Sequence, residues 1–182
     1  MLTHLTLPDA LSPADCDRLV GRAAASPARD ARLQGGTTAH DLRRADLVWL
    51  DDLGDSSGLM DALARAVAEA NRSFGYVLGD LAESAQIARY DAARQGHFDW
   101  HSDIGRSGLA ARRKLTMVVQ LTDPDAYEGG ALELRPGAEV EVAPRACGSA
   151  TLFPSFVLHR VTPVTRGTRW SLTLWAHGPA FT

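Results

Sequence analysis

The chain has 182 residues, a length that fits one domain with a hydrophobic core large enough to need no disulfides. Its composition, 45% hydrophobic and 23% charged residues, is that of an ordinary globular protein. A net charge of −3 argues against nucleic acid or an anionic membrane surface as the main partner. Two cysteines, Cys16 and Cys147, are too few for a disulfide framework or a cysteine-rich metal site.

The first residues give no sign of a targeting signal, because residues 1–10 lack both a basic segment and a long apolar run. No stretch approaches the roughly 18 consecutive apolar residues of a transmembrane helix. We therefore expect a protein of the reducing cytoplasm, a monomer or a homodimer, with neither a nucleic-acid nor a membrane partner.

Two segments in the first half of the chain carry helix signals. Ser12 is a good capping residue and Pro13 is tolerated at the first helical position. A helix is therefore expected from Pro13 to about Ala25. A second helix is expected over residues 57–74, because its apolar residues recur on one face. These residues are Leu59, Leu63, Ala66, Val67, Ala70 and Phe74.

The rest of the chain is predicted mainly as short strands between turns, with a Gly- and Thr-rich loop at residues 34–41. The expected strands are Leu2–Leu7 at an edge, Arg43–Leu50, Ala85–Tyr90, Gly96–His101, Lys114–Thr122, Ala131–Leu134, Glu139–Val142, Ala150–Phe153, Val157–Pro163 and Trp170–Ala176. This order predicts an α+β, mainly β fold, either a jelly roll or a barrel covered by helices. One domain over residues 1–182 is expected, with a mixed front half (1–84) and a jelly-roll core (85–176).

The densest group of metal-binding side chains lies in the stretch Gly96–Asp103. In an extended strand, alternate side chains share a face, so four of them would point the same way: His97, Asp99, His101 and Asp103. Burying four such groups is costly unless they bind something. They form two successive His-x-Asp pairs, His97/Asp99 and His101/Asp103, and the spacing alone does not choose between them.

A His-x-Asp pair supplies two metal ligands, and a histidine from a distant strand would complete a set of two histidines and one carboxylate. Such a set leaves three positions open on an octahedral metal, as in non-haem Fe(II) oxygenases. Of the other histidines, His159 lies in a strand-like apolar segment, whereas His4 is near the terminus. His40 falls in the Gly/Thr-rich loop and His177 precedes a Gly-Pro tail.

Three motifs in order, spanning about residues 85–176, give the chain a family resemblance. The run 159–172, His-Arg-Val-Thr-Pro-Val-Thr-Arg-Gly-Thr-Arg-Trp-Ser-Leu, resembles the distal half of the Fe(II)/2-oxoglutarate dioxygenase signature. It is most similar to the prolyl-4-hydroxylase-like branch, which includes bacterial PKHD-type hydroxylases. Residues 127–134 resemble that family's aromatic-x-Gly-Gly-x-Leu hairpin. Its proximal pattern, Tyr…Gly-x-(Tyr/Phe)-x-x-His-x-Asp, is matched by Tyr90, Gly96, Phe98, His101 and Asp103.

The resemblance implies a double-stranded β-helix (jelly roll) core with the N-terminal helices packed against one sheet. It also implies that His101, Asp103 and His159 hold Fe(II). His97 and Asp99 would then support the site, for example by holding substrate at the pocket mouth. The reverse choice, with His97 and Asp99 as ligands, is the alternative. A related implication concerns Asp103: halogenases of the wider family lack this carboxylate, so its presence favours hydroxylation, with desaturation and demethylation as open alternatives.

Arg169 is expected to bind the distal carboxylate of 2-oxoglutarate. A planar, always-charged guanidinium suits a bidentate carboxylate, and a buried arginine without a partner is costly. The alternative is a surface salt bridge. By resemblance Tyr90 would add a hydrogen bond, its alternative role being aromatic packing. Ser171 and Thr173 alternate with Arg169 on the last strand and would line the pocket, whereas Trp175 is assigned to the core.

The implied activity is hydroxylation of an unactivated C–H bond, coupled to decarboxylation of 2-oxoglutarate to succinate and CO2. It would use Fe(II), 2-oxoglutarate and O2, with ascorbate as a reductant. The substrate would be a prolyl residue in a protein or peptide, or a free amino acid or metabolite. Residues 34–46 and the basic stretch 104–114 are expected to surround it, the latter as a lid or as a solvated loop.

Two rival functions use the same three ligands. A non-catalytic metal-binding jelly-roll protein or sensor would need the ligands but neither Arg169 nor Tyr90. A zinc-dependent hydrolase would need a general-base carboxylate such as Asp99 close by.

Overall fold

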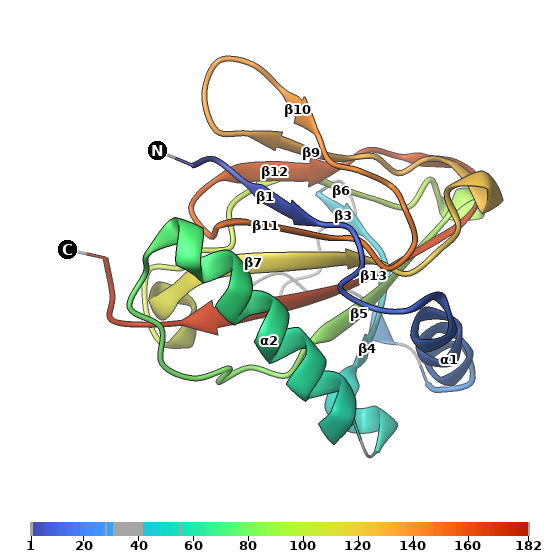
Figure 1. Ribbon diagram of the computed structural model, residues 1–182. Coiled ribbons are helices and arrows are strands. Elements are labelled where there is room, and N and C mark those ends of the chain that lie inside the picture. Colours follow the sequence, from blue (N-terminus) through green and yellow to red (C-terminus); the bar gives the residue numbers. More distant parts are fainter. Residues whose placement is uncertain (1, 28, 31–41, 55, 182) are drawn as a thin grey trace.

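The computed structural model describes residues 2–27, 29–30, 42–54 and 56–181. They form two stacked antiparallel β-sheets, with two α-helices against the outer face of the larger sheet (Figure 1). The predicted loop at residues 34–41 lies outside the described residues. Neither of the two α-helices seen in the described ranges is long and apolar enough to cross a membrane.

Both predicted helices are confirmed. Helix α1 (Pro13–Ala24) begins after Ser12, whose hydroxyl accepts a hydrogen bond from the backbone N–H of Asp15 at 3.2 Å. This bond satisfies one of the N–H groups that the first helical turn leaves unpaired. Helix α2 (Ser57–Phe74) ends at Gly75, whose φ of 73° is the left-handed conformation that favours glycine at a helix end.

The larger sheet runs in the order β1-β11-β7-β13-β5-β4-β2, with β8 pairing to the first part of β13. Its strands are β1 (Leu5–Leu7), β2 (Arg29–Asp30), β4 (Asp46–Trp49), β5 (Gln86–Asp91), β7 (Arg113–Gln120), β8 (Tyr127–Gly129), β11 (Ala150–Pro154) and β13 (Val164–His177). Strand β13 is central, because it pairs with β5 on one side and β7 on the other.

The smaller sheet runs in the order β10-β9-β12-β6-β3. Its strands are β3 (Arg43–Arg44), β6 (His97–His101), β9 (Leu132–Arg135), β10 (Glu141–Val142) and β12 (Leu158–Val161). Short 3₁₀ helices lie at Leu50–Leu53, Ala92–Arg94, Leu109–Arg112 and Pro124–Ala126. Together the sheets form the predicted jelly roll, so the expected fold class is confirmed.

The larger sheet separates two hydrophobic cores. Between this sheet and the helices, Leu19 of α1 and Leu63 of α2 pack with Leu172 and Leu174 of β13. Between the two sheets lies a smaller apolar cluster: Ala45, Leu47, Ala88, Tyr90, Val118, Leu132, Leu134, Ala143, Phe153, Val157, Val161 and Val164. The helices therefore cover one face of the sheet and leave the other face to the space between the sheets.

The predicted strand Arg43–Leu50 is not one strand. Arg43 pairs with Phe98 in the smaller sheet, whereas Asp46 pairs with Arg89 in the larger sheet. The chain changes sheets at Ala45, which is buried in the cluster between them. A change of sheet leaves no trace in the alternation of apolar and polar residues, so the pattern predicted a single strand.

Strand β13 is longer than the predicted strand Trp170–Ala176, because it begins at Val164. The added part contains Gly167. Gly167 has a φ of 70°, and a Cβ there would lie 2.1 Å from the carbonyl oxygen of Ala126 in the neighbouring chain segment. The glycine therefore serves a close approach within an irregular strand pair.

Candidate active site

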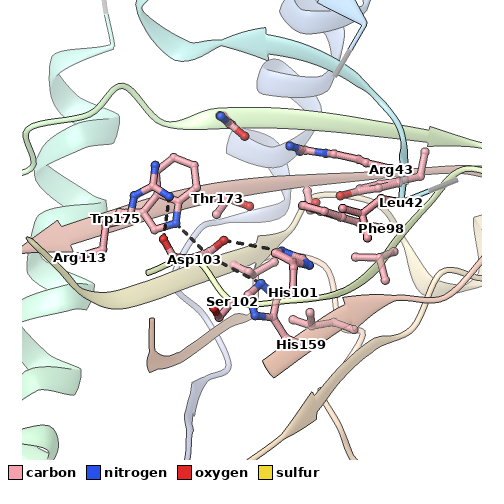
Figure 2. Close-up of a pocket in the computed structure, with 16 residues that line it drawn as sticks. Leu42, Arg43, Phe98, His101, Ser102, Asp103, Arg113, His159, Thr173 and Trp175 are labelled. Atoms are coloured by element: carbon pink, nitrogen blue, oxygen red, sulfur yellow. Dashed lines mark hydrogen bonds and ion pairs between the residues drawn. The ribbon is translucent and has the colours of Figure 1, made fainter. Parts of the chain in front are cut away.

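A cavity of about 300 Å³ opens between the two sheets (Figure 2). Polar and charged groups converge in it although most of its walls are apolar, as in many ligand-binding pockets. The lining residues are Leu42, Arg43, Gln86, Tyr90, Phe98, His101, Ser102, Asp103, Arg113, Val118, Leu132, His159, Val161, Ser171, Thr173 and Trp175. They come from β3 and the residue before it, from β5, β6, β7, β9, β12 and β13, and from the segment after β6.

Strand pairing brings the predicted triad together. His159 of β12 lies directly opposite His101 of β6. Asp103 follows β6, where its backbone N–H donates to the carbonyl of Ser155 at 2.9 Å. One possible ligand atom from each of these three residues lies within 4.8 Å of the others. Among the described residues, these three form the one cluster of metal-capable side chains.

The prediction that His97, Asp99, His101 and Asp103 all point one way is wrong. Opposite the three residues His159 to Val161, strand β6 places the four residues Phe98 to His101, so it carries a β-bulge. The extra residue breaks the alternation and puts Phe98 on the same side as His101. Their rings stack with centroids 3.4 Å apart.

The bulge also removes His97 and Asp99 from the cavity, since neither lines it. Asp99 is exposed, and its carboxylate accepts from the backbone N–H of Trp100 at 2.8 Å. His97 makes a ring-nitrogen contact of 2.9 Å with the carbonyl of Gln95. Neither residue is therefore part of the cavity lining or of the cluster of metal-capable side chains.

Backbone carbonyls orient both cavity histidines. Nδ1 of His101 lies 2.8 Å from the carbonyl of Asp99, and Nδ1 of His159 lies 3.0 Å from that of Val157. Because a carbonyl only accepts, we assign the proton to Nδ1 in each ring. The unprotonated Nε2 atoms then face Asp103, each 3.6 Å from one of its carboxylate oxygens. This arrangement is the one that prepares histidines for metal binding.

The charge states of the triad also suit a cation. Burial and the neighbouring His159 together lower the pKa of His101 to about 3, against a smaller opposite effect of Asp103. Burial raises the pKa of Asp103, but His159, His101 and the Trp175 N–H outweigh this effect and hold the pKa below its usual value. At neutral pH the site therefore presents a neutral imidazole at His101 and a carboxylate at Asp103.

Asp103 is fixed by two further donors that the sequence did not reveal as functional. The hydroxyl of Thr116 donates to its Oδ2 at 2.8 Å, and the indole N–H of Trp175 donates to the same oxygen at 3.0 Å. Trp175 was assigned to the core, yet it lines the cavity. Its place on the face of Ser171 and Thr173 was the available signal.

A charged pair supports Trp175 from behind. The guanidinium of Arg113 lies 3.9 Å from the centroid of the Trp175 ring and donates to the Asp103 carbonyl at 3.0 Å. Arg113 also forms a two-bond ion pair with Glu83, one of the bonds being 2.6 Å. Glu83 in turn contacts His177 at 2.8 Å. His177 is therefore part of this network rather than of the triad.

Arg169 is wholly buried beside the cavity. It donates to the amide oxygen of Gln120 at 3.0 Å and to the Ser171 hydroxyl at 3.2 Å, both neutral partners. Its guanidinium lies 5.3 Å from the ring centroid of Tyr90, the residue opposite it on β5. Among the described residues no carboxylate pairs with Arg169, and its Nε has no hydrogen-bond partner.

The predicted Gly-Gly hairpin packs closely against Arg169. Gly129 and Gly130 have φ values of 70° and 60°. A Cβ at Gly130 would lie 3.0 Å from Cδ of Arg169 and 2.9 Å from a methyl group of Val164. Any larger residue at Gly130 would therefore press on the arginine.

Of the remaining sequence candidates, Tyr90, Ser171 and Thr173 line the cavity as expected. His4 is distant from the triad and contacts Glu141 at 2.9 Å. His40 lies outside the described residues. The basic stretch 104–114 contains the 3₁₀ helix Leu109–Arg112 and ends in β7, where Arg113 and Lys114 are buried. It is thus not wholly a solvated loop.

Comparisons with known proteins agree with this geometry. The family sequence model described as "2OG-Fe(II) oxygenase superfamily" matches residues 85–177, about half of the chain. A PKHD-type hydroxylase of Polaromonas is 31% identical, over 94% of this chain and 77% of the relative. One of Methylobacterium nodulans is 29% identical, over 97% and 78%.

Among solved structures, a prolyl-4-hydroxylase of Pseudomonas putida superposes with a TM-score of 0.77 at 21% identity, covering 98% of this chain and 94% of that one. The chain belongs to the 2OG-Fe(II) oxygenase superfamily, in its PKHD-type branch. It is therefore an oxygenase of a family that uses Fe(II), 2-oxoglutarate and O2.

Proposed function

We propose that His101, Asp103 and His159 bind Fe(II), and that Arg169 anchors the distal carboxylate of 2-oxoglutarate. The observation that carries the proposal is the joint presence of two unlike sites around one cavity. One is a buried cluster of three metal-capable groups. The other is a buried arginine with only neutral partners among the described residues.

The residues present fit both groups. Two imidazole Nε2 atoms and one carboxylate oxygen are donors that Fe(II) accepts, and they would occupy three of six positions. Thr116 and Trp175 both donate to Oδ2 of Asp103, so they restrain the carboxylate and favour Oδ1 as the ligand atom. The guanidinium of Arg169 supplies the fixed planar donor set that a carboxylate prefers.

Each of the chain's own residues then has a defined task. Arg169, with Ser171 and Gln120 holding its NH groups, would set the depth at which 2-oxoglutarate enters. Tyr90 lines the cavity next to Arg169, and its hydroxyl would donate to the cosubstrate. Phe98, stacked on His101, would keep water from the ligand ring.

The reaction we propose is hydroxylation of an unactivated C–H bond of a substrate in the same cavity. When bound, Fe(II) and 2-oxoglutarate supply the oxidising chemistry, in which O2 is consumed and 2-oxoglutarate becomes succinate and CO2. Relatives named PKHD-type hydroxylases and neighbours named prolyl hydroxylases favour a prolyl residue of a protein or peptide, or a related amino acid, as the substrate.

Succinate formation from 2-oxoglutarate tests the proposal. The protein is incubated with Fe(II) and O2, and succinate is measured for the wild type and for two variants, His159→Ala and Arg169→Ala. We expect both variants to lose most of the turnover, H159A by losing metal and R169A by losing cosubstrate affinity. Equal succinate formation in R169A would refute the assignment of Arg169, and Fe-independent turnover would refute the triad.

Three finer expectations stay predictions. They are the use of ascorbate as a reductant, the cytoplasmic location, and the choice between a monomer and a homodimer. A titration of ascorbate into the succinate assay and a sedimentation measurement address the first and the last.

A further inference from the structure

Arg43 is a second arginine enclosed between the two sheets, and it lines the cavity itself. Only 9% of the residue is exposed. Because β3 pairs with β6, Arg43 lies opposite Phe98, and its guanidinium carbon sits 4.4 Å from the centroid of that ring. Figure 2 shows Arg43 at one end of the cavity and Arg113 at the other, with His101 and His159 between them.

The Arg43 guanidinium has no ionic partner among the described residues. Its Nε is buried and forms no hydrogen bond there, and no carboxylate of those residues pairs with it. The contact with the face of Phe98 attracts the cation, but a ring cannot satisfy its N–H donors. A buried, always-charged group with free donors calls for an anion in the cavity.

The other cationic side chains of the cavity region are already assigned. Arg113 pairs with Glu83, and Arg169 is the proposed partner of 2-oxoglutarate. In the loaded site the two charges of Fe(II) and the one of Arg169 are balanced by Asp103 and the two carboxylates of 2-oxoglutarate. Arg43 is then the one uncompensated charge among the described residues that line or adjoin this cavity, so the missing anion belongs to the substrate.

The position of Arg43 limits the size of that substrate. Two ring contacts, 4.4 Å from the guanidinium to Phe98 and 3.4 Å from Phe98 to His101, join Arg43 to the triad. The cavity volume of about 300 Å³ is at the small end for ligand pockets and would also hold 2-oxoglutarate. The anion and the reacting C–H bond must therefore be only a few bonds apart.

We propose that Arg43 binds the α-carboxylate of the substrate, so that the substrate is an amino acid, either free or as the C-terminal residue of a peptide. The proposal rests on the proposed function, since it places the reacting carbon at the triad. Arg43 lies in the stretch 34–46 that the sequence marked as substrate-determining, and it gives that stretch a specific chemistry. An internal prolyl residue would offer Arg43 only a neutral amide.

Matched acids and amides test the proposal. The probes are the twenty common L-amino acids and the tripeptides Gly-Gly-X with the same twenty residues, each as the acid and as the amide. Binding to the protein with Fe(II) and 2-oxoglutarate is measured by calorimetry without oxygen, so that no turnover occurs. The free and peptide series distinguish the two sources of the carboxylate.

We expect at least one acid to bind in clear preference to its amide. Arg43→Gln should weaken the binding of that acid by about 10- to 100-fold, the effect of a lost charge-assisted bidentate pair. It should leave the binding of the amide unchanged. Arg43→Lys should recover part of the affinity, because it keeps the charge but not the planar fork. Arg44→Gln is the matched control, since Arg44 pairs with His97 on the other face of β3 and should change binding less than twofold.

Three results would overturn the proposal: no acid probe binds, acids and amides bind equally, or R43Q weakens the binding of 2-oxoglutarate as strongly as Arg169→Gln does. The last result would make Arg43 a cosubstrate residue. Thermal melting of each variant confirms that it folds. If the wild type binds no 2-oxoglutarate but still binds an acid through Arg43, the proposed function fails and the carboxylate site stands.

Discussion

The two faces of strand β13 differ in almost every property although they belong to one backbone. The face toward the helices carries Leu172, Leu174 and Ala176, all buried in the larger core. The face toward the smaller sheet carries Arg169, Ser171, Thr173 and Trp175, which line or adjoin the cavity. Adjacent residues of one strand therefore have different tasks: those on one face stabilise the fold, and those on the other face form the cavity. Substitutions on the two faces should therefore have different consequences.

The largest effect is expected on the cavity side of the neighbouring sheet, at His159. His159→Ala should lower Fe-dependent succinate formation by more than the roughly 100-fold that loss of a ligand's hydrogen-bond partner can cost. The thermal midpoint should change little, because His159 packs at the cavity rather than in the helix-facing core. Succinate assays and thermal melting are compared on one preparation, and a large loss of stability would contradict the separation of the two faces.

The reverse behaviour is expected for Leu172→Ala on the helix-facing side. Leu172 is completely buried, so its truncation should reduce the free energy of unfolding by about 2–5 kcal/mol through lost burial and the cavity left behind. Activity per folded molecule should remain within twofold of the wild type. Denaturant unfolding gives the stability, and loss of turnover in fully folded protein would show that the faces are coupled.

Glu83→Gln addresses the pair that supports the cavity from one end. The change should cost about 1–3 kcal/mol, because it leaves the buried Arg113 without its carboxylate. Burial raises the pKa of Glu83, but Arg113 and His177 outweigh it, so the pKa lies below its usual value. A carboxyl with a lowered folded pKa stabilises the protein above its unfolded pKa and loses this contribution as the pH falls through the folded pKa. The wild type should therefore lose stability faster than E83Q in that acidic range, as unfolding at several pH values would reveal.

The smallest of these effects is expected for Trp175→Phe, which keeps an aromatic ring but removes the N–H that binds Asp103. Metal affinity should fall by about tenfold, the lower end of the range for a lost hydrogen bond to a metal ligand. The free energy of unfolding should fall by about 1 kcal/mol. Titration with Fe(II) measures the affinity. A tenfold loss of Fe(II) affinity in Trp175→Phe, with wild-type Fe(II) affinity in Leu172→Ala, would sharpen the comparison of the two faces. If Trp175→Phe binds Fe(II) as tightly as the wild type, Trp175 does not support the metal site.

The sequence predicted the parts of the molecule that depend on local order. Both helices and most strands follow from periodicity and turn residues, and His101, Asp103 and His159 follow from motifs in a fixed order. The structure brings these three together, while their role as ligands stays a prediction. Periodicity also correctly placed Ser171 and Thr173 beside Arg169.

What the sequence could not predict depends on pairing between distant segments. The bulge in β6 exists only relative to β12, which lies more than fifty residues further along the chain. Whether the charge of Arg43 is compensated depends on the side chains that surround it in the fold. The two consecutive arginines, Arg43 and Arg44, do not reveal these neighbours. Gln120 and Trp175 looked like ordinary strand residues because their partners, Arg169 and Asp103, are remote in sequence.

The bulge in β6 determines which His-x-Asp pair a metal ion in the cavity would meet. Residues 97–103 contain two His-x-Asp pairs, His97/Asp99 and His101/Asp103, and a regular strand would present both to the same cavity. An entering ion would then meet two neighbouring sites. By inserting one residue, the strand turns the pair His97 and Asp99 away and offers an aromatic ring, Phe98, in its stead. With this one extra residue, the strand presents only one of the two His-x-Asp pairs to the cavity.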